Sequence, residues 1–299
     1  MVKITQKPEW LRKKVFYTPT NQNIRNLLKS HDINTVCEEA RCPNLSECYD
    51  HKTATFLIMG DICTRSCLYC SVESTSPSGI KESPLALPDP DEPDRIAQVV
   101  RNMGLDYVVI TSVDRDDLSD GGADHFAKTL KAIHSIDPNI KIEVLTPDFK
   151  GDWDAITQVL LEKPDVFNHN VETVERVNPI VRKQGSYRLS LSILEGLKKT
   201  DPNRITKTGI MLGLGERDHE LRQAFKDLRD VACDILTMGQ YLQPTRRNYP
   251  VQSYIPEDQF NAYKEEALSL GIPVVHSSPF VRSSYKAFES YHQVMKLRN

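Results

Sequence analysis

An alternation of short apolar runs with longer amphipathic segments limits most strongly which folds this 299-residue chain can adopt. Runs rich in β-branched and aromatic residues predict strands, and apolar residues at helical spacing predict helices. The predicted strands are Thr55–Met59, Tyr107–Val113, Lys141–Thr146, Val166–Val171, Ile205–Leu212 and Ile235–Tyr241. The predicted helices are Pro93–Met103, Ala123–Ser135, Asp152–Leu161, Tyr187–Lys199, Asp218–Val231 and Pro256–Leu270. This order is typical of an α/β fold with a parallel sheet.

The six βα units predict a partial (β/α)6 barrel of the TIM type, because a closed barrel needs about eight strands. Val274 and Val275 could add an edge strand. The predicted barrel spans residues 54–275, with an N-terminal extension at residues 1–53 and a C-terminal extension at residues 276–299. Ser74–Glu92 is rich in Pro, Ser and Asp, which predicts a long loop after the first strand.

Composition narrows the classes of function. The formal net charge is −3 and the basic residues are scattered, so we expect no nucleic-acid partner. No apolar run resembles a signal peptide or a membrane span, so we expect a cytoplasmic protein without a membrane partner. We also expect the protein to be a monomer. The cytoplasm keeps thiols reduced, so the seven cysteines favour metal or redox chemistry over disulfides.

Three cysteines form the sequence CTRSCLYC directly after the first predicted strand, at Cys63, Cys67 and Cys70. The carboxyl end of a barrel strand is where this architecture places its chemistry. Three thiolates can bind three irons of a four-iron cluster, which leaves one iron open to a substrate. A structural zinc site would need four ligands, and although His51 is near, no second cysteine pair is present. The spacing therefore favours an iron-sulfur cluster.

A second cysteine set forms the sequence CEEARCPNLSEC, with Cys37, Cys42 and Cys48 in the N-terminal extension. Cysteines are frequently buried as small apolar residues, which is the plainer interpretation. However, charged residues such as Glu38 and Arg41 lie next to these cysteines, and charged residues are uncommon in an apolar core. Clustered thiols in a polar segment are more often metal ligands, so this set predicts a second metal site.

The CxxxCxxC pattern, with Tyr69 before its last cysteine, resembles the radical S-adenosylmethionine superfamily. Both cysteine patterns together resemble the lipoyl synthase family. Further segments similar to that family are Val108–Phe126, Val166–Val177, Gly209–Glu216, Tyr241–Val251 and Pro279–Ala287, and together the similar segments cover most of the chain.

The resemblance implies a sulfurtransferase that inserts two sulfur atoms at C6 and C8 of an octanoyl chain carried on a lysine of a carrier protein. It implies two [4Fe-4S] clusters and S-adenosylmethionine, which the open iron chelates and which reductive cleavage converts to methionine and a 5'-deoxyadenosyl radical. Cys63, Cys67 and Cys70 would hold the reductive cluster. The other cluster, held by Cys37, Cys42, Cys48 and a serine of the RSSY segment, would donate its sulfides to the product.

That serine ligand would be Ser284, although Ser283 is not excluded. From sequence alone, serines near a terminus are usually solvated or capping residues. The implied partners are octanoylated carrier domains, namely 2-oxoacid dehydrogenase E2 subunits and the glycine cleavage H protein, with ferredoxin or flavodoxin as reductant.

Polar residues and glycines at the ends of other predicted strands are candidates for binding S-adenosylmethionine. They are Thr111, Ser112, Asn168, Asn170, Glu172, Gly213, Gly215, Glu216 and Gln243. The glycines would allow backbone to approach a ligand closely, although GLG is also common in turns. Arg182 could pair with a carboxylate, but a solvated charge at a helix start is the commoner meaning. Cys233, His169 and His276 are predicted to be structural.

Two other functions remain open on these residues. One is a different radical enzyme with an auxiliary cluster, and the other is a non-catalytic iron-sulfur electron carrier. A zinc-stabilised module would instead be colourless and free of iron.

Overall fold

The computed structural model describes residues 7–14, 16–75, 79 and 85–298, so part of the predicted loop Ser74–Glu92 lies outside the described residues. The chain divides into two compact units. The N-terminal unit comprises residues 15–66 and 71–165, and the C-terminal unit comprises residues 1–14, 67–70 and 166–299. The predicted domain boundaries at residues 53 and 275 stay a prediction.

The N-terminal unit is built on neighbouring strands in the order β1, β2, β5 and β6. Their bounds are Asn34–Thr35, Thr55–Ile58, Tyr107–Ser112 and Lys141–Leu145. β2, β5 and β6 are parallel, whereas β1 pairs with β2 in the antiparallel sense. A separate short parallel pair joins β3 (Ile62–Cys63) to β4 (Glu73–Ser74).

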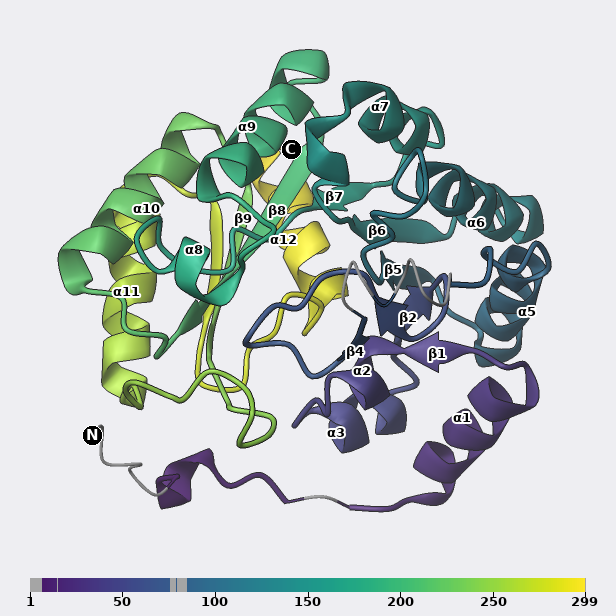
Figure 1. Cartoon of the computed structure of the whole chain (residues 1–299), viewed down its shortest axis with the longest axis horizontal. Coiled ribbons are helices and arrows are strands. Elements are labelled where there is room, and N and C mark those ends of the chain that lie inside the picture. Colours follow the sequence, from purple (N-terminus) through teal and green to yellow (C-terminus); the bar gives the residue numbers. More distant parts are fainter. Residues whose placement is uncertain (1–6, 15, 76–78, 80–84, 299) are drawn as a thin grey trace. The chain divides into compact units, whose positions relative to one another are not determined.

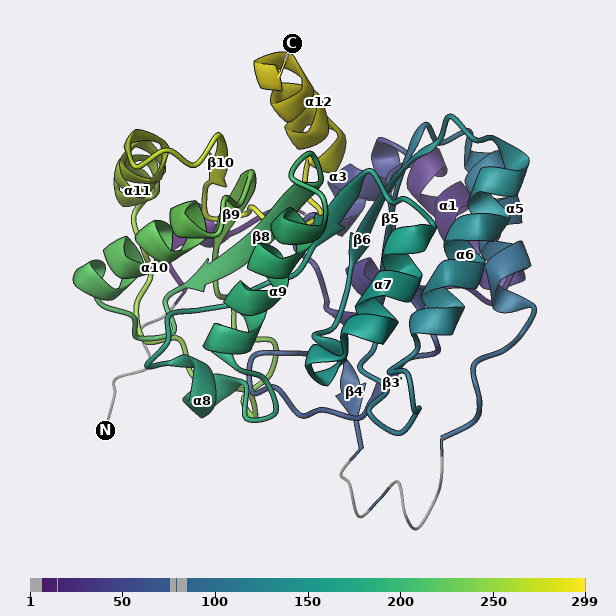
Figure 2. The ribbon, with the colours of Figure 1, turned by 90° about the horizontal axis from the view of Figure 1, so that it is seen from above.

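Helices α5 (Glu92–Met103), α6 (Ala123–Ile136) and α7 (Trp153–Leu161) pack side by side along the strands of this unit (Figures 1 and 2). The sequence explains the bounds of α5, because Pro93 lies in its first turn and Gly104 ends it with a φ of +64°. Before β2 lie α1 (Pro19–Ser30), α2 (Val36–Glu39) and α3 (Leu45–Asp50), and the short helix η2 (Phe149–Gly151) follows β6.

The C-terminal unit contains parallel neighbouring strands in the order β7, β8, β9 and β10. Their bounds are Val166–Asn168, Ile205–Leu212, Ile235–Gln240 and Val274–Ser277. The helices are η1 (Glu9–Leu11), α8 (Asn178–Val181), α9 (Tyr187–Thr200), α10 (Asp218–Asp230), α11 (Glu257–Ser269) and α12 (Ala287–Arg298). β9 is buried along its whole length, as expected of a strand covered on both faces.

The predicted α/β fold with parallel strands is confirmed. β7 is shorter than predicted, because beyond Asn168 the hydroxyl of Thr208 donates to the His169 carbonyl and accepts from the Val171 N–H, so a side chain replaces the backbone pairing there. The edge strand expected at Val274 and Val275 is β10. None of the described helices is long and apolar enough to cross a membrane.

Candidate functional site

Cys63 lies where the sequence predicted, at the carboxyl ends of parallel strands in the N-terminal unit. The backbone N–H and the hydroxyl of Thr64 both donate to the carbonyl of Asp114, just after β5, at 2.9 Å. The Sγ of Cys63 lies 3.8 Å from Asp114 Oδ2. The backbone N–H of Thr75 donates to the Cys63 carbonyl at 2.9 Å. The first part of the cysteine loop is therefore fixed against the loop after β5.

Arg65, midway between Cys63 and Cys67 in this loop, is buried among carboxylates. Its guanidinium donates to both oxygens of Asp116 at 2.7 and 2.9 Å and to both oxygens of Asp148 at 2.8 and 2.7 Å. Burial by itself lowers the pKa of Arg65, but these hydrogen bonds raise it above its ordinary value. The side chain is therefore a permanent buried cation.

The second part of the cysteine loop belongs to the C-terminal unit. The backbone N–H of Cys70 donates to the carbonyl of Cys67 at 3.0 Å, which closes a turn. The side-chain amide of Asn248 donates to the Cys70 carbonyl at 2.7 Å, and the backbone N–H of Tyr249 donates to the Leu68 carbonyl at 2.8 Å. The segment after β9 thus holds the turn that carries these two cysteines.

Tyr69, within this turn, packs against the apolar core of the C-terminal unit and close to predicted ligand-binding residues. Burial raises the pKa of Tyr69, and the nearby charge of Glu172 raises it further. Arg182 is buried and donates to Ser190 Oγ at 3.1 Å and to the Asn170 carbonyl at 3.3 Å. The interpretation of Arg182 as a solvated charge at a helix start is therefore wrong, because the chain folds its guanidinium inward.

Cys37, Cys42 and Cys48 lie together in the N-terminal unit. α2 carries Cys37 and α3 carries Cys48, and the Cys42 N–H donates to the Cys37 carbonyl at 3.0 Å. Thr35 caps α2, and its hydroxyl lies 2.8 Å from the hydroxyl of the buried Tyr49. Burial, together with the neighbouring Cys42 and Cys48, raises the pKa of the Cys37 thiol to about 12. The three thiols are thus close enough to influence one another.

The two serines of the RSSY segment differ in their contacts. Ser283 Oγ accepts from Asn170 Nδ2 at 2.8 Å and lies 3.0 Å from Asn170 Oδ1. A Cβ at Gly209 would lie 2.8 Å from Ser283 Oγ, so the glycine leaves the room for this contact. Within the described part of the chain, Ser284 makes no side-chain hydrogen bond. Of the two serines, Ser284 is thus the one whose side-chain oxygen makes no hydrogen bond with the described residues.

Thr111, Ser112 and Asn168 lie at the ends of strands as predicted. Thr111 Oγ1 donates to the Leu145 carbonyl at 2.8 Å, which ties the end of β5 to β6. Asn168 at the end of β7 is completely buried. Ser112 Oγ is buried and has no hydrogen-bond partner among the described residues. A buried hydroxyl without a partner is costly, so this oxygen is available to a ligand.

The segment after β8 is shaped by its own residues. Gly213 and Gly215 have φ angles of +99° and +102°, which favour glycine. The carboxylate of Glu216 accepts from the backbone N–H of Gly213, and burial raises the pKa of Glu216. Gln243 donates to the Asn248 carbonyl at 2.8 Å, inside the segment after β9. These contacts stabilise the loops themselves. Binding of a ligand by these residues stays a prediction.

The donor chemistry of both cysteine sets suits iron-sulfur clusters. Among the described residues no cysteine forms a disulfide, and Cys42, Cys48, Cys63, Cys67 and Cys70 are partly exposed. Thiolates are the ordinary ligands of such clusters. Among the described residues, no three His, Cys, Asp or Glu side chains already take positions that could hold a metal ion. The thiols of Cys37, Cys42 and Cys48 would therefore have to turn toward a common centre.

Comparison with known proteins identifies the family. The model of the radical SAM superfamily matches residues 57–228. The lipoyl synthase of Caldicellulosiruptor saccharolyticus is 48% identical over 286 residues, which are 96% of this chain and 98% of that protein. This chain belongs to the lipoyl synthase family. The lipoyl synthase of Alkaliphilus metalliredigens, also 48% identical, matches over 98% of this chain and 99% of its own length.

Solved structures show the same fold at much lower identity. The crystal structure of Streptococcus suis SuiB bound to S-adenosylmethionine aligns with a TM-score of 0.57 and 11% identity, over 78% of this chain and 53% of that chain. HydG, a maturase of the [FeFe]-hydrogenase, aligns with a TM-score of 0.51 and 12% identity, over 79% of this chain and 61% of its own. The predicted partial barrel is thus the fold of radical SAM proteins.

Membership of the lipoyl synthase family confirms that the chain is a sulfurtransferase whose cofactors are S-adenosylmethionine and [4Fe-4S] clusters. Sequence reasoning missed the role of Arg65 and of its partners Asp116 and Asp148. The sequence shows Arg65 between Cys63 and Cys67 and places Asp116 in the acidic run DRDD. Pairing them required knowledge of which loops meet.

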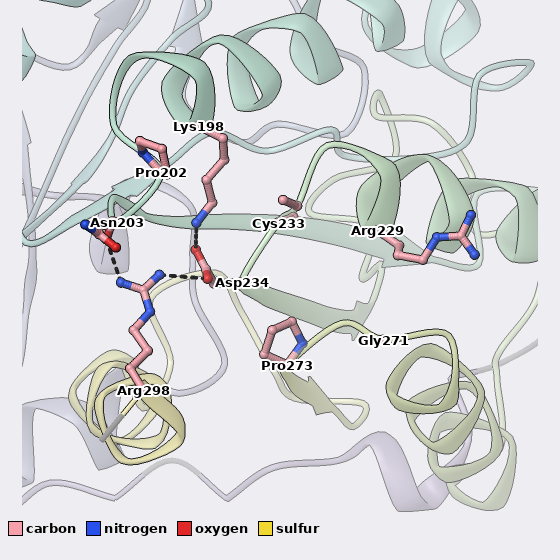
Figure 3. Close-up of a pocket in the computed structure, with 10 residues that line it drawn as sticks. Lys198, Pro202, Asn203, Arg229, Cys233, Asp234, Gly271, Pro273 and Arg298 are labelled. Atoms are coloured by element: carbon pink, nitrogen blue, oxygen red, sulfur yellow. Dashed lines mark hydrogen bonds and ion pairs between the residues drawn. The ribbon is translucent and has the colours of Figure 1, made fainter.

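A pocket of about 700 Å³ in the C-terminal unit lies away from the strand ends that carry the predicted site (Figure 3). It opens near the residues that precede β8, β9 and β10. Asp234 pairs with two cations here, with Lys198 Nζ at 2.6 Å and with Arg298 Nη2 at 2.9 Å. Cys233 is buried here, as predicted for a core thiol. In this family of folds the amino ends of strands serve stability, which is how we interpret this pocket.

Proposed function

We propose that this member of the lipoyl synthase family inserts two sulfur atoms, at C6 and C8, into an octanoyl chain attached to a lysine of a carrier protein. The observation that carries the proposal is the match to lipoyl synthases along 96% of the chain at 48% identity. Cys63 at the end of parallel strands supports it, because barrel enzymes place their chemistry there.

Cys63, Cys67 and Cys70 would hold the reductive cluster, and Cys37, Cys42 and Cys48 would hold the auxiliary cluster with a serine. When bound, the reductive cluster and S-adenosylmethionine supply a 5'-deoxyadenosyl radical for hydrogen abstraction, and the auxiliary cluster supplies sulfur. The protein positions these groups and excludes water. Tyr69 contributes to that exclusion, since it packs its ring on the core beside the cysteine turn.

Binding of S-adenosylmethionine falls to residues at the strand ends. Ser112 offers a buried hydroxyl without a described partner, which suits a ligand hydrogen bond. Arg182 and Glu172 provide a buried cation and a carboxylate next to Tyr69. The remaining proposed contacts are Thr111, Asn168, Asn170, Gly213, Gly215, Glu216 and Gln243.

Ser284 is the proposed serine ligand, because Ser283 already exchanges hydrogen bonds with Asn170. A serine oxygen is a harder and less firmly held iron ligand than a thiolate, so it would ease the opening of a cluster that is consumed. We expect Ser284→Cys to keep the auxiliary iron but to lose most lipoyl product, measured by mass spectrometry. Full activity of this variant would remove the support for the idea, and Ser283→Cys is the matched comparison.

The octanoylated partners would be the E2 subunits of 2-oxoacid dehydrogenases and the glycine cleavage H protein, with ferredoxin or flavodoxin supplying electrons. The cytoplasmic location and the monomeric state stay predictions.

The deciding experiment compares the wild-type protein with a variant in which Cys37, Cys42 and Cys48 are all alanine. After anaerobic reconstitution we expect about eight irons per wild-type chain and about four in the variant. The variant should keep S-adenosylmethionine cleavage and lose the lipoyl product on an octanoyl-lysine peptide. About four irons in both proteins would mean that these cysteines bind no cluster.

The same measurements separate the other functions. A different radical enzyme with an auxiliary cluster would cleave S-adenosylmethionine but leave the octanoyl peptide unchanged. An electron carrier would hold iron without cleaving S-adenosylmethionine. A zinc-stabilised module would contain no iron at all.

A further inference from the structure

Arg65, the buried arginine of the cysteine loop, bonds to carboxylates of two other loops. Arg65 lies two residues from both Cys63 and Cys67, and only 3% of it is exposed. Each of two carboxylates accepts two of its N–H groups, so Asp116 and Asp148 both form forked pairs with it. Such bidentate pairs fix geometry as well as charge.

The two partners belong to loops that follow different strands. Asp116 follows β5, 51 residues from Arg65, and Asp148 follows β6, 83 residues from Arg65. Asp148 is 1% exposed and also accepts from the backbone N–H of Lys150 at 2.9 Å. The guanidinium therefore joins the loops after three parallel strands, β2, β5 and β6.

The same loops also meet through a second set of contacts close to Cys63. Thr64 Oγ1 accepts from the Asp116 N–H at 2.9 Å and donates to the Asp114 carbonyl at the same distance. Asp114 Oδ1 lies 3.3 Å from Arg65 Nε, and its other oxygen lies 3.8 Å from the sulfur of Cys63. Arg65 thereby offsets the charge of a carboxylate that faces a proposed iron ligand.

We propose that Arg65 is the positioning residue of the reductive cluster: its double fork to Asp116 and Asp148 fixes the start of the cysteine loop so that Cys63 is held for iron. This inference rests on the proposed function, since it assumes that Cys63 binds a cluster. None of the four forked hydrogen bonds uses a cysteine sulfur, so the network and a cluster do not compete for the same atoms. Lysine cannot replace the fork, because its ammonium is a point charge without planar paired donors.

The test measures iron retention by the reductive set alone. Its parent is the full chain with Cys37, Cys42 and Cys48 replaced by alanine, so that all iron reports on Cys63, Cys67 and Cys70. Into this parent we introduce Arg65→Lys, which keeps the charge and removes the fork. Mutation of residues that support the metal ligands typically weakens metal binding by about 10-fold to 100-fold. We therefore expect Arg65→Lys to lose iron to a chelator about tenfold faster than the parent. The electron paramagnetic resonance spectrum of the reduced cluster should also change.

A matched control exists beside the site. Arg115 is also 3% exposed, and its guanidinium forms a fork with Asp117 at 2.8 and 2.7 Å, but it donates its remaining contact to the Ala86 carbonyl. Arg115→Lys should lose iron at the parent rate, with the parent spectrum. Equal acceleration in both variants would show general destabilisation and overturn the proposal.

A second variant guards against failure to fold. Asp116→Asn breaks one fork at a side chain that is 25% exposed, so it leaves less buried charge uncompensated than a change at Asp148. If circular dichroism shows that Arg65→Lys is unfolded, faster iron loss in Asp116→Asn supports the proposal, and the parent rate overturns it. A folded Arg65→Lys with the parent rate and spectrum also overturns it. A parent without iron would instead contradict the proposed function, and this inference with it.

Discussion

The two cysteine segments of the N-terminal unit are held in different ways. At Cys63, buried charges and a threonine hydroxyl tie the loop to residues after β5 and β6. At Cys37 and Cys48, the cysteines lie on helices of four and six residues. The polar contacts beside them include the hydroxyl pair of Thr35 and Tyr49, the ion pair of Arg25 with Glu38 and the hydrogen bond from Ser71 Oγ to the Glu39 carbonyl. Helices this short are marginal without tertiary packing.

The difference matches what each segment is proposed to do. A cluster that serves every turnover benefits from a fixed loop, because misplaced ligands weaken metal binding. A cluster that is consumed has to be opened and rebuilt, so its ligands need a segment that can rearrange. Metal binding commonly couples to folding in such segments. Three measurements test this contrast.

The largest effect concerns thiol reactivity in cluster-free protein. Burial raises the pKa of Cys37 and of Cys233 to about 12 from an ordinary 9.0, and each pKa unit lowers the thiolate fraction tenfold at neutral pH. At pH 8 we expect iodoacetamide to modify both about a thousandfold more slowly than an ordinary exposed cysteine. Their rates should rise with pH up to about 12, because the neutral thiol is favoured until the raised pKa is passed.

Peptide mapping by mass spectrometry reports each cysteine separately. Cys63, which is partly exposed, should react much earlier than Cys37. Cys233 is the control, because it is buried in the apolar core of the C-terminal unit and is not a proposed ligand. If Cys37 reacts as fast as Cys63 while Cys233 stays protected, the segment of Cys37 opens readily in solution.

A second effect concerns the coupling of the auxiliary cluster to local folding. We expect Cys42→Ala to leave the N-terminal extension disordered while the barrel stays folded, since the extension loses a ligand that metal binding would use to order it. Limited proteolysis should cut the reconstituted variant within residues 37–50 about tenfold faster than the reconstituted wild type. Unchanged protease sensitivity between the cluster-free and reconstituted wild type would contradict the coupling.

The smallest effect compares single polar groups in the two segments. Tyr49→Phe removes one hydroxyl contact, that with Thr35, and should lower the free energy of unfolding by about 1 kcal/mol. Thr64→Val removes two hydrogen bonds of a hydroxyl, those with the Asp114 carbonyl and the Asp116 N–H. It should lower the free energy of unfolding by about 2 kcal/mol. Urea denaturation measures both. Equal losses would mean that the cysteine loop is no more firmly held than the extension.

Much of the architecture followed from the pattern of apolar residues. β8 spans Ile205–Leu212, as predicted, and α5, α6 and α9 end within a residue of their predicted bounds. The spacing of apolar residues and the capping residues of helices are local signals that extend over a few positions. They can therefore be recognised in a single sequence. The early end of β7 could not be predicted from the sequence, since it depends on the hydroxyl of Thr208, which bonds to the backbone of His169 and Val171 from the neighbouring strand.

The candidate site divides in the same way. The sequence by itself determined both cysteine sets, the strand before Cys63 and the family resemblance, because ligand spacing and alternation are local properties of the chain. Only the tertiary structure decided that Arg182 is buried, that Ser283 is engaged by Asn170, and that Arg65 is held by two carboxylates. Asp116 and Asp148 lie 51 and 83 residues from Arg65, and the sequence does not show that they pair with it. Which charged residues form a buried ion pair depends on which loops the folded sheet brings together.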